Sequence, residues 1–302
     1  MPEWSNWSGS VTGAPVRYLS PSSEGELQAL VREAGQAGLR VRAHGTGHSF
    51  TPIAVGDDVL VSLEQWTGLE TVDRERGRAT VRAGTTLHEL GALLLGHGLA
   101  MENLGDVDVQ TLAGAVSTGT HGTGPTFGNI SSQVTALRLV TADGALLECS
   151  AEQDEETYLA ARVSLGMLGM ISAITLRLLP AFRLHERVWR APIDETMDKL
   201  DQHIDMNEHF EFFWYPSLDA AECKTLNTAV GGPEDIGKLE PVTVLASRTT
   251  GMAALAENLG DLPGERVGWS AGIIPSVRTR KFNEMEYALP AGEGPACFQR
   301  VR

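Results

Sequence analysis

The chain lacks several features that mark particular protein classes. It has three cysteines, Cys149, Cys223 and Cys297, whose wide spacing fits neither a disulfide framework nor a metal cluster. It has no run of about 18 apolar residues, so no transmembrane helix is predicted. Its first residues lack the basic and apolar parts of a secretory signal. We therefore expect free thiols and a cytoplasmic location.

Basic residues are also scarce. Lys and Arg number 24 against 39 Asp and Glu, which gives a formal net charge of −15. Nucleic acids and anionic membranes both need a basic face, so neither is expected as a partner. The apolar share of 42% and the charged share of 21% are ordinary for a globular core. At 302 residues the chain exceeds a typical domain, so two domains are expected.

A glycine-rich turn follows a strand-like stretch near the N-terminus. Residues 42–50 read Arg-Ala-His-Gly-Thr-Gly-His-Ser-Phe. Glycine tolerates positive φ and close approach of a ligand, so such a turn can direct backbone N–H groups at a diphosphate. The third glycine of the dinucleotide fingerprint is missing, and no amphipathic helix follows. The turn instead carries His48, whose imidazole would lie beside the bound group.

A second segment, residues 103–124, is equally rich in small residues. Its apolar run at residues 111–116 includes Ala113, Gly114 and Ala115, which permit a short, closely packed helix. Residues 117–124 then offer hydroxyls, backbone donors and the His121 imidazole to a flat ring system. A surface loop alone would not need the apolar run. The two segments together predict a cofactor cradle.

These two segments resemble the PCMH-type FAD domain of the vanillyl-alcohol oxidase superfamily, and most closely the sugar-lactone and alditol oxidases. The resemblance implies FAD as cofactor. In covalent members the histidine of the Gly-x-Gly-His-Ser motif carries the flavin through its 8-methyl carbon, which here is His48. The cofactor-binding residues that the resemblance implies are His44, Gly45, Thr46, Gly47, His48, Ser49, Gly105, Asp106, Thr111, Gly114, Ala115, Ser117, Thr118, Gly119, His121, Gly122, Gly124 and Ile171.

Other interpretations of these residues remain open at this point. His48 could be a loop histidine that bonds its own backbone. A metal site of His44, His48 and His121 is disfavoured because the spacing matches no common ligand pattern, so no metal is expected. If Gly47 and Gly122 approach the cofactor, an added Cβ at either should cost FAD binding more than stability.

The pattern over residues 14–181 predicts an α+β domain of two subdomains. Ser23 and Glu26 form a capping box for a helix that Gly38 stops, and Thr85 is expected to cap a second helix. Two hairpins are predicted, one turning at residues 74–77 and one at 142–144. The remaining predicted strands are residues 16–20, 39–43, 59–63 and 171–179. Residues 161–171, with glycines between apolar residues, are interpreted as core.

Residues 182–302 are predicted to form a second domain. Residues 1–13 are predicted to be a separate N-terminal segment that precedes the first domain. The resemblance implies an incomplete substrate (cap) domain with an antiparallel sheet. Predicted elements are a strand at 182–189, a helix at 193–203, an aromatic strand at 209–216 and a cap strand at 283–290. The aromatic strand is expected to pack in the core rather than to stack on sugar. Residues 226–250 are predicted to be a long connection, and residues 298–302 the start of a helix.

The resemblance implies an FAD-dependent oxidoreductase that acts on CH–OH groups of sugar lactones. Hydride would pass to flavin N5, with reoxidation by dioxygen or another acceptor. An alditol oxidase of the xylitol type is the alternative. Relatives carry a Glu-x-Arg pair and a His-Trp-x-Lys motif on the substrate side, and neither occurs in these 302 residues. We therefore expect a C-terminally truncated relative, assign no catalytic residue, and keep a flavin-binding module without turnover as a third alternative.

Overall fold

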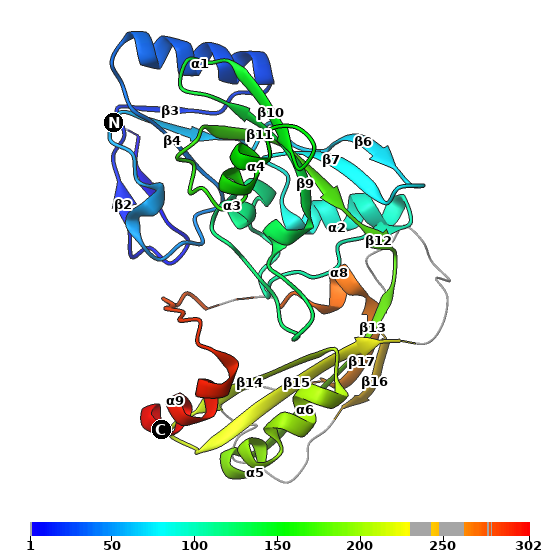
Figure 1. The fold of residues 1–302 in the computed structure, drawn as a ribbon. Helices are drawn as coiled ribbons and strands as arrows, with labels where there is room; N and C mark the ends of the chain where they lie inside the picture. Colours follow the sequence, from blue (N-terminus) through cyan, green and yellow to red (C-terminus); the bar gives the residue numbers. More distant parts are fainter. Residues whose placement is uncertain (1, 230–242, 248–262, 277, 279) are drawn as a thin grey trace.

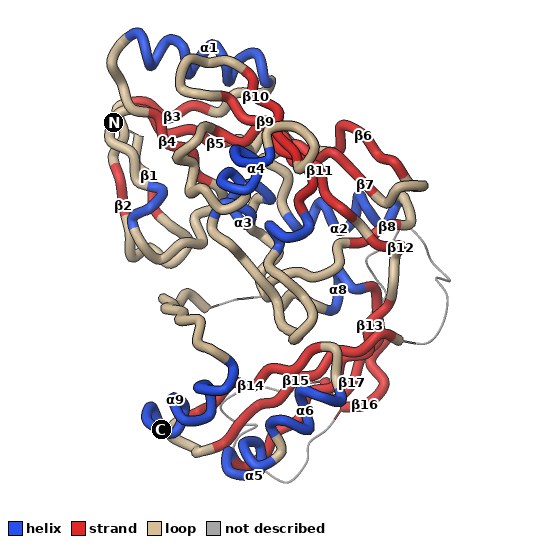
Figure 2. Tube along the Cα trace, in the orientation of Figure 1, coloured by secondary structure: helices blue, strands red, loops and turns tan. Residues whose placement is uncertain are grey.

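The computed structural model describes residues 2–229, 243–247, 263–276, 278 and 280–302. Figure 1 shows two bodies, one built from the N-terminal half and one from the C-terminal half, with β13 (Arg183–Pro192) leading from the first into the second. Figure 2 shows helices and strands mixed in both bodies, which makes the fold α+β. We propose that the boundary between them lies between residues 181 and 182.

The first subdomain is a parallel sheet covered by one long helix. Its strand order is β3 (Arg17–Leu19), β5 (Val59–Ser62), β4 (Val41–His44). Helix α1 (Glu24–Gln36) buries Leu27, Val31 and Ala34. The short strands β1 (Trp4–Ser5) and β2 (Thr12–Gly13) form a separate ribbon, and η1 (Pro52–Ala54) follows the glycine-rich turn.

The second subdomain is a five-stranded antiparallel sheet in the order β10-β9-β11-β7-β6. Its strands are β6 (Leu69–Asp73), β7 (Arg78–Arg82), β9 (Val134–Val140), β10 (Leu146–Ser150) and β11 (Met170–Arg177). Four helical segments pack around it, namely α2 (Leu87–Gly96), α3 (Leu112–Ser117), η2 (Ile130–Gln133) and α4 (Glu155–Ala161). A small pair, β8 (Leu99–Ala100) and β12 (Leu179–Pro180), closes the unit.

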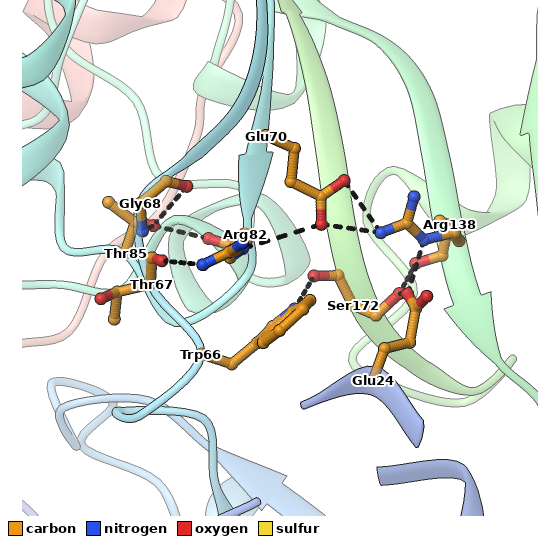
Figure 3. Close-up of polar contacts among 9 residues, drawn as sticks. All are labelled: Glu24, Trp66, Thr67, Gly68, Glu70, Arg82, Thr85, Arg138 and Ser172. Atoms are coloured by element: carbon orange, nitrogen blue, oxygen red, sulfur yellow. Dashed lines mark hydrogen bonds and ion pairs between the residues drawn. The ribbon is translucent and has the colours of Figure 1, made fainter. Parts of the chain in front are cut away.

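A polar network joins the two subdomains (Figure 3). The Arg138 guanidinium donates to Glu24 on α1 at 2.5 Å and to Glu70 on β6 at 2.8 Å. The Ser172 hydroxyl donates to the same Glu24 carboxylate at 2.6 Å. All three charged side chains are only about one-fifth exposed, so each depends on its partners to offset the loss of water. Together with a continuous apolar core that includes Leu27, the network makes the two subdomains one unit.

The second body is an antiparallel sheet in the order β14-β15-β13-β17-β16. Besides β13, its strands are β14 (His209–Tyr215), β15 (Ala220–Thr228), β16 (Thr243–Ser247) and β17 (Pro263–Trp269). Helices α5 (Ile193–Asp198) and α6 (Leu200–Met206) cover its outer face (Figure 1). The remaining elements are α8 (Ser270–Ile273), η3 (Ala291–Glu293) and α9 (Gly294–Val301).

Many local predictions are confirmed. The Ser23 hydroxyl accepts from the Glu26 N–H at 3.2 Å, and Gly38 ends the helix with φ +68°. The predicted capping box is only half formed, because the Glu26 carboxylate accepts from the Ser22 N–H at 2.8 Å rather than from that of Ser23. Both predicted hairpins are present, and Gly144 has the positive φ that its turn requires. Alternate side chains of the aromatic strand, Phe210 and Phe212 among them, pack in a core cluster as expected.

The predicted cap of the second helix is wrong by one residue. Thr86, not Thr85, is the N-cap of α2: its hydroxyl accepts from the Glu89 N–H at 3.2 Å. The Glu89 carboxylate accepts in return from the Thr86 N–H at 3.1 Å. Thr85 is fully buried and donates to the Arg82 carbonyl at 2.7 Å. Of the two threonines, only Thr86 has a glutamate three residues later, which is what a capping box needs.

Two predictions in the second domain are also wrong. Residues 283–290 form no strand and are exposed: the segment begins beside the first domain, where Glu286 contacts His121, and then leads back to α9 at the cap sheet (Figure 1). Residues 226–250 are not one connection: β15 continues to Thr228 and β16 falls within the range. The rest of that range lies outside the described residues. The helix expected at residues 298–302 is present and begins earlier, at Gly294.

Among the described residues, no helix combines the length and apolarity needed to span a bilayer. The three cysteines are free; Cys149 and Cys223 are buried. Burial raises the pKa of the Cys223 thiol to about 11, which makes it unreactive as a thiolate at neutral pH.

Candidate flavin site

A pocket lies between the glycine-rich turn after β4, the start of α3 and the turn before β11. It borders about 1130 Å³ of empty space, part of which is open solvent. Its lining comes from residues 41–49, from residues 110–118 and from residues 165–171, together with Trp4, Ile53, Ala54, Leu63 and Ala83. Three stretches distant in sequence therefore meet around one cavity.

The charge of the lining differs from that of the whole chain. Although the chain carries 39 acidic residues, no Asp or Glu lines this pocket in the part of the chain that the structure describes. Arg42 and the hydroxyl residues Thr46, Ser49, Ser117 and Thr118 do. A diphosphate needs backbone and hydroxyl donors and the absence of negative neighbours, so the lining fits a dinucleotide cofactor.

An unsatisfied amide oxygen points to a ligand donor. Gln110 lines the pocket, and its Oε1 is buried with no hydrogen-bond partner among the described residues. Its amide nitrogen donates to the Thr120 hydroxyl at 3.4 Å, which identifies the oxygen as the remaining acceptor. A buried acceptor left without a donor is costly, and an N–H or O–H of a bound ring or ribityl chain would satisfy it.

Glycine is required where the two loops meet. A Cβ on Gly45 would overlap the Thr111 hydroxyl, and one on Gly114 would lie 2.9 Å from the same oxygen. Gly47 has φ +76°, and a Cβ there would lie 3.2 Å from the Asn6 Cα. The loops thus approach each other, and the N-terminal segment, through positions without side chains.

The two histidines of the turn have different surroundings. His44 Nδ1 lies 2.5 Å from the Gly45 carbonyl, and its Nε2 lies 3.0 Å from the Tyr18 hydroxyl. Since a carbonyl only accepts, Nδ1 carries the proton and both His44 nitrogens are engaged. His48 Nδ1 contacts the Thr46 hydroxyl at 3.2 Å, and its Nε2 has no partner within the described part of the chain. Burial lowers the pKa of both imidazoles, so both are neutral at pH 7.

The N-terminal segment supplies residues that sequence reasoning missed. Trp4 is buried, lines the pocket and packs edge-on against His44. Trp7 stacks on His48 with ring centroids 5.1 Å apart and planes 23° apart. The two tryptophans within the first seven residues could have indicated that this segment packs against the rest of the protein, since large rings rarely lie free at a terminus.

Residues 162–169, the turn before β11, are not core as predicted, whereas Ala161 and Ile171 at the two ends of the predicted stretch are buried in the core. Exposed fractions in the turn are 43% for Leu165 and 77% for Met167. Leu165 and Gly166 have φ +53° and +75°, which turns the chain outward along the pocket. The alternation of glycines and apolar residues at 161–171 therefore builds a pocket wall, and it contributes Leu165, Gly166, Gly169 and Met170 to the lining.

The pocket collects most, but not all, of the predicted residues. Eleven line it, namely His44, Gly45, Thr46, Gly47, His48, Ser49, Thr111, Gly114, Ser117, Thr118 and Ile171. Those placed elsewhere are Gly105, Asp106, Ala115, Gly119, His121, Gly122 and Gly124. Ala115 is fully buried in the core, and a Cβ on Gly122 would overlap the Leu104 carbonyl and the Asn103 amide. Gly122 is thus in contact with protein rather than with the pocket.

Asp106 and His121 face the second domain. Asp106 pairs with Arg278, and its Oδ1 lies 4.0 Å from the Lys224 ammonium. His121 Nε2 lies 2.5 Å from a Glu286 oxygen, and its Nδ1 lies 2.8 Å from the Gly122 carbonyl. The end of the second segment therefore forms part of the seam between the domains.

Charged side chains occupy the cap-sheet face that lies towards the first domain. Strand register aligns Lys224 with Glu211, and the Lys224 ammonium lies 3.0 Å from that carboxylate. One row along, Arg190 pairs with Glu222 at 3.4 Å. The Lys224 and Arg190 side chains are only 12% and 14% exposed, and burial raises the pKa of Glu222. A face with buried charges is suited to a polar ligand and poorly suited to an apolar one.

Comparison with known proteins agrees with this geometry. Residues 15–150 match the family described as "FAD binding domain", and residues 174–255 match the family described as "D-arabinono-1,4-lactone oxidase". L-gulono-1,4-lactone dehydrogenase of Mycobacterium tuberculosis is 39% identical over 319 aligned positions, which cover 99% of this chain and 73% of that protein. L-gulonolactone oxidase of Mus musculus is 38% identical over 214 positions, covering 71% of this chain and 49% of that protein.

The chain belongs to this family of FAD-dependent aldonolactone oxidases and dehydrogenases. A solved cholesterol oxidase from Brevibacterium sterolicum shares the fold, with a TM-score of 0.72 at 19% identity over 92% of this chain and 62% of that one. The expected PCMH-type FAD fold is thereby confirmed, as is FAD as the cofactor. At that level of identity the structural likeness shows the fold alone.

Proposed function

We propose that this protein oxidises a CH–OH group of a sugar lactone with FAD bound in the pocket. The observation that carries the proposal is the pair of buried charge rows on the cap face, Lys224 with Glu211 and Arg190 with Glu222. A polyhydroxylated ring can exchange hydrogen bonds with such groups. The structural neighbours named cholesterol oxidase act, by that name, on an apolar molecule, for which this face is unsuited.

Residues of the first domain would bind the cofactor, and residues of the second domain would orient the substrate. FAD, when bound, supplies the electron sink that takes a hydride from the substrate carbon. The glycine turn and α3 would hold the diphosphate and the ring through backbone donors and small side chains. Gln110 would accept one cofactor hydrogen bond through Oε1. Lys224 and Arg190 would orient substrate hydroxyl and carbonyl oxygens by charge-assisted hydrogen bonds. Dioxygen or another acceptor would receive the electrons.

We further propose that His48 holds the cofactor covalently. A neutral imidazole with an unengaged ring nitrogen is the nucleophile that such a bond needs. His48 has both properties, whereas both ring nitrogens of His44 are engaged in hydrogen bonds. One bond forms between an imidazole nitrogen and the 8-methyl carbon. One proton leaves the methyl group and one leaves the imidazole. The two electrons pass to an acceptor such as dioxygen, which becomes hydrogen peroxide.

The covalent bond is tested by acid precipitation of the purified protein. We expect the wild-type precipitate to retain yellow, fluorescent flavin, His48→Ala to release all of it, and His44→Ala to retain it. Release of flavin from the denatured wild type would refute attachment and leave His48 as a non-covalent contact.

The substrate is tested by anaerobic bleaching of the flavin, which needs no electron acceptor. We expect L-gulono-1,4-lactone or D-arabinono-1,4-lactone to bleach it faster than xylitol, and cholesterol to leave it oxidised. Lys224→Gln should slow bleaching by about tenfold or more, because a charge-assisted contact is worth about 1.5–3 kcal/mol. Its control is Lys199→Gln, which removes an exposed lysine paired with Glu195 on the outer cap face.

Each alternative gives a different result in the same experiment. Faster bleaching by xylitol than by either lactone would identify an alditol oxidase. No bleaching by any sugar, with flavin fully bound, would identify a flavin-binding module without turnover. A cytoplasmic location remains our proposal and is supported by the free cysteines.

A further inference from the structure

The structure gives the N-terminal segment a defined relation to the His48 ring. The Trp7 indole lies across one face of the imidazole, with centroids 5.1 Å apart and planes 23° apart. Trp7 does not line the pocket, whereas His48 does. The indole therefore stacks on the imidazole without itself lining the cavity that His48 lines. This is the arrangement of a support for another side chain, not of a cofactor contact.

The indole is itself fixed by backbone contacts to the same turn. The backbone N–H of Trp7 donates to the Gly47 carbonyl at 2.7 Å, and the side-chain amide of Asn6 donates to the Ser49 carbonyl at 3.1 Å. Asn6 is buried, and its side-chain oxygen accepts from the Val11 N–H at 3.0 Å. Gly47 and Ser49, the two neighbours of His48, are thus hydrogen-bonded to Trp7 and Asn6, respectively.

A second aromatic ring also packs against the indole. Phe282, in the last part of the cap domain, packs edge-on against Trp7 with centroids 5.1 Å apart. It also contacts Phe50, directly after the turn, at 5.7 Å. The Thr46 hydroxyl lies at His48 Nδ1 and restricts rotation of the ring about its own bonds. The imidazole is therefore restricted both by a stacked ring and by a hydrogen bond.

We propose that Trp7 is a positioning residue for the attachment of FAD: by stacking on His48 it holds the imidazole in the orientation in which it lines the pocket. The inference rests on the covalent attachment proposed above. A bond between two groups forms fast only when both are held near the reactive geometry, and a misplacement of about 1 Å costs up to about 100-fold in rate. Without the indole, the His48 ring would sample rotamers that face away from the cavity.

The test is a time course of attachment. Flavin-free protein is made in a riboflavin-starved host and mixed with FAD under air, and acid-stable flavin is measured at intervals. We expect Trp7→Leu to slow attachment by about 10- to 100-fold, with Trp7→Phe restoring most of the rate because a flat ring is retained. The control Trp189→Leu, in the cap domain, should attach FAD at the wild-type rate.

Two further measurements separate positioning from a general structural role. The dissociation constant for FAD, measured in the His48→Ala background where no bond can form, should change less than threefold on Trp7→Leu. In flavin-free protein, the His48 imidazole proton should lose its upfield ring-current shift in Trp7→Leu and regain part of it in Trp7→Phe.

The outcomes distinguish this inference from the proposed function. If wild-type protein forms no acid-stable flavin, the covalent attachment fails and this inference fails with it. If wild type attaches FAD and Trp7→Leu attaches it equally fast, only the positioning role is overturned. If Trp7→Leu weakens FAD binding as strongly as it slows attachment, the role is structural and the inference is also overturned.

Discussion

The first flavin turn, residues 44–49, and the second segment, residues 103–124, look alike in sequence but are used differently. All six residues of the turn line the pocket. The second segment divides: residues 110–118 line the pocket, apart from Leu112, Ala115 and Val116, which are buried in the core. Its two ends face the cap domain through Asp106 and His121. The first stretch lines the candidate flavin pocket throughout, whereas the second lines it only in its middle part and contacts the cap domain near both ends.

The glycines show the difference most clearly. In the first turn, glycine permits loops to meet beside the cavity, as at Gly45. At the end of the second segment, Gly122 permits the chain to pass against the Leu104 carbonyl, away from the cavity. Similar Gly and Thr patterns can therefore reflect ligand contact or chain packing, and only the tertiary neighbours distinguish the two.

The largest effect is expected at Gly122. An added Cβ in Gly122→Ala overlaps backbone that cannot move aside, so we expect a loss of about 3 kcal/mol in the free energy of unfolding. Urea denaturation of flavin-free protein measures it. The control, Gly96→Ala, adds the same methyl to the end of α2, where nothing lies within 4 Å, and should be neutral or stabilising by up to about 1 kcal/mol. A Gly122→Ala protein of normal stability that fails to bind FAD would instead support direct contact between Gly122 and the cofactor.

The same comparison shows what could be predicted from sequence. The first turn was predictable because a strand, two glycines and a histidine are contiguous, and local chemistry decides their geometry. Gln110 and Trp7 were not, because their roles exist only once distant segments meet. The family resemblance implied a strand at residues 283–290, but a strand also needs a neighbour with free backbone groups, which the segment itself does not encode. Glycines at 166 and 169 were ambiguous between close packing and outward turns.

An intermediate effect is expected where the two stretches touch. The Thr111 hydroxyl caps α3 by accepting from the Gly114 N–H at 3.3 Å, and a Cβ on Gly45 would displace it. Gly45→Ala should therefore cost about 1–2 kcal/mol, and Thr111→Ala about 1 kcal/mol through the lost cap. The double variant should cost less than the sum by about 0.5–1 kcal/mol, because the displaced group is already gone. Additive losses in urea denaturation would mean that the two loops are independent.

The smallest effect is expected at the outer end of the second segment, in the pair His121 and Glu286. The Gly122 carbonyl first, and then the Glu286 carboxylate, raise the pKa of His121 above its usual 6.5, with Glu284 adding to the effect. Because the folded pKa is raised, the stabilisation is fully present below pH 6.5 and is lost as pH rises through the folded value.

The test is a double-mutant cycle of His121→Gln and Glu286→Gln at two pH values. At about pH 5.5 we expect a coupling of about 0.5 kcal/mol, small because both side chains are at least half exposed. At about pH 9 the imidazole is neutral and the coupling should fall towards zero. NMR titration should show the His121 pKa falling in Glu286→Gln. A coupling that is equal at both pH values would mean that the contact is a neutral hydrogen bond. In that case the second segment would contribute no charge to the seam at its His121 end, and its electrostatic link to the cap would lie with Asp106 alone.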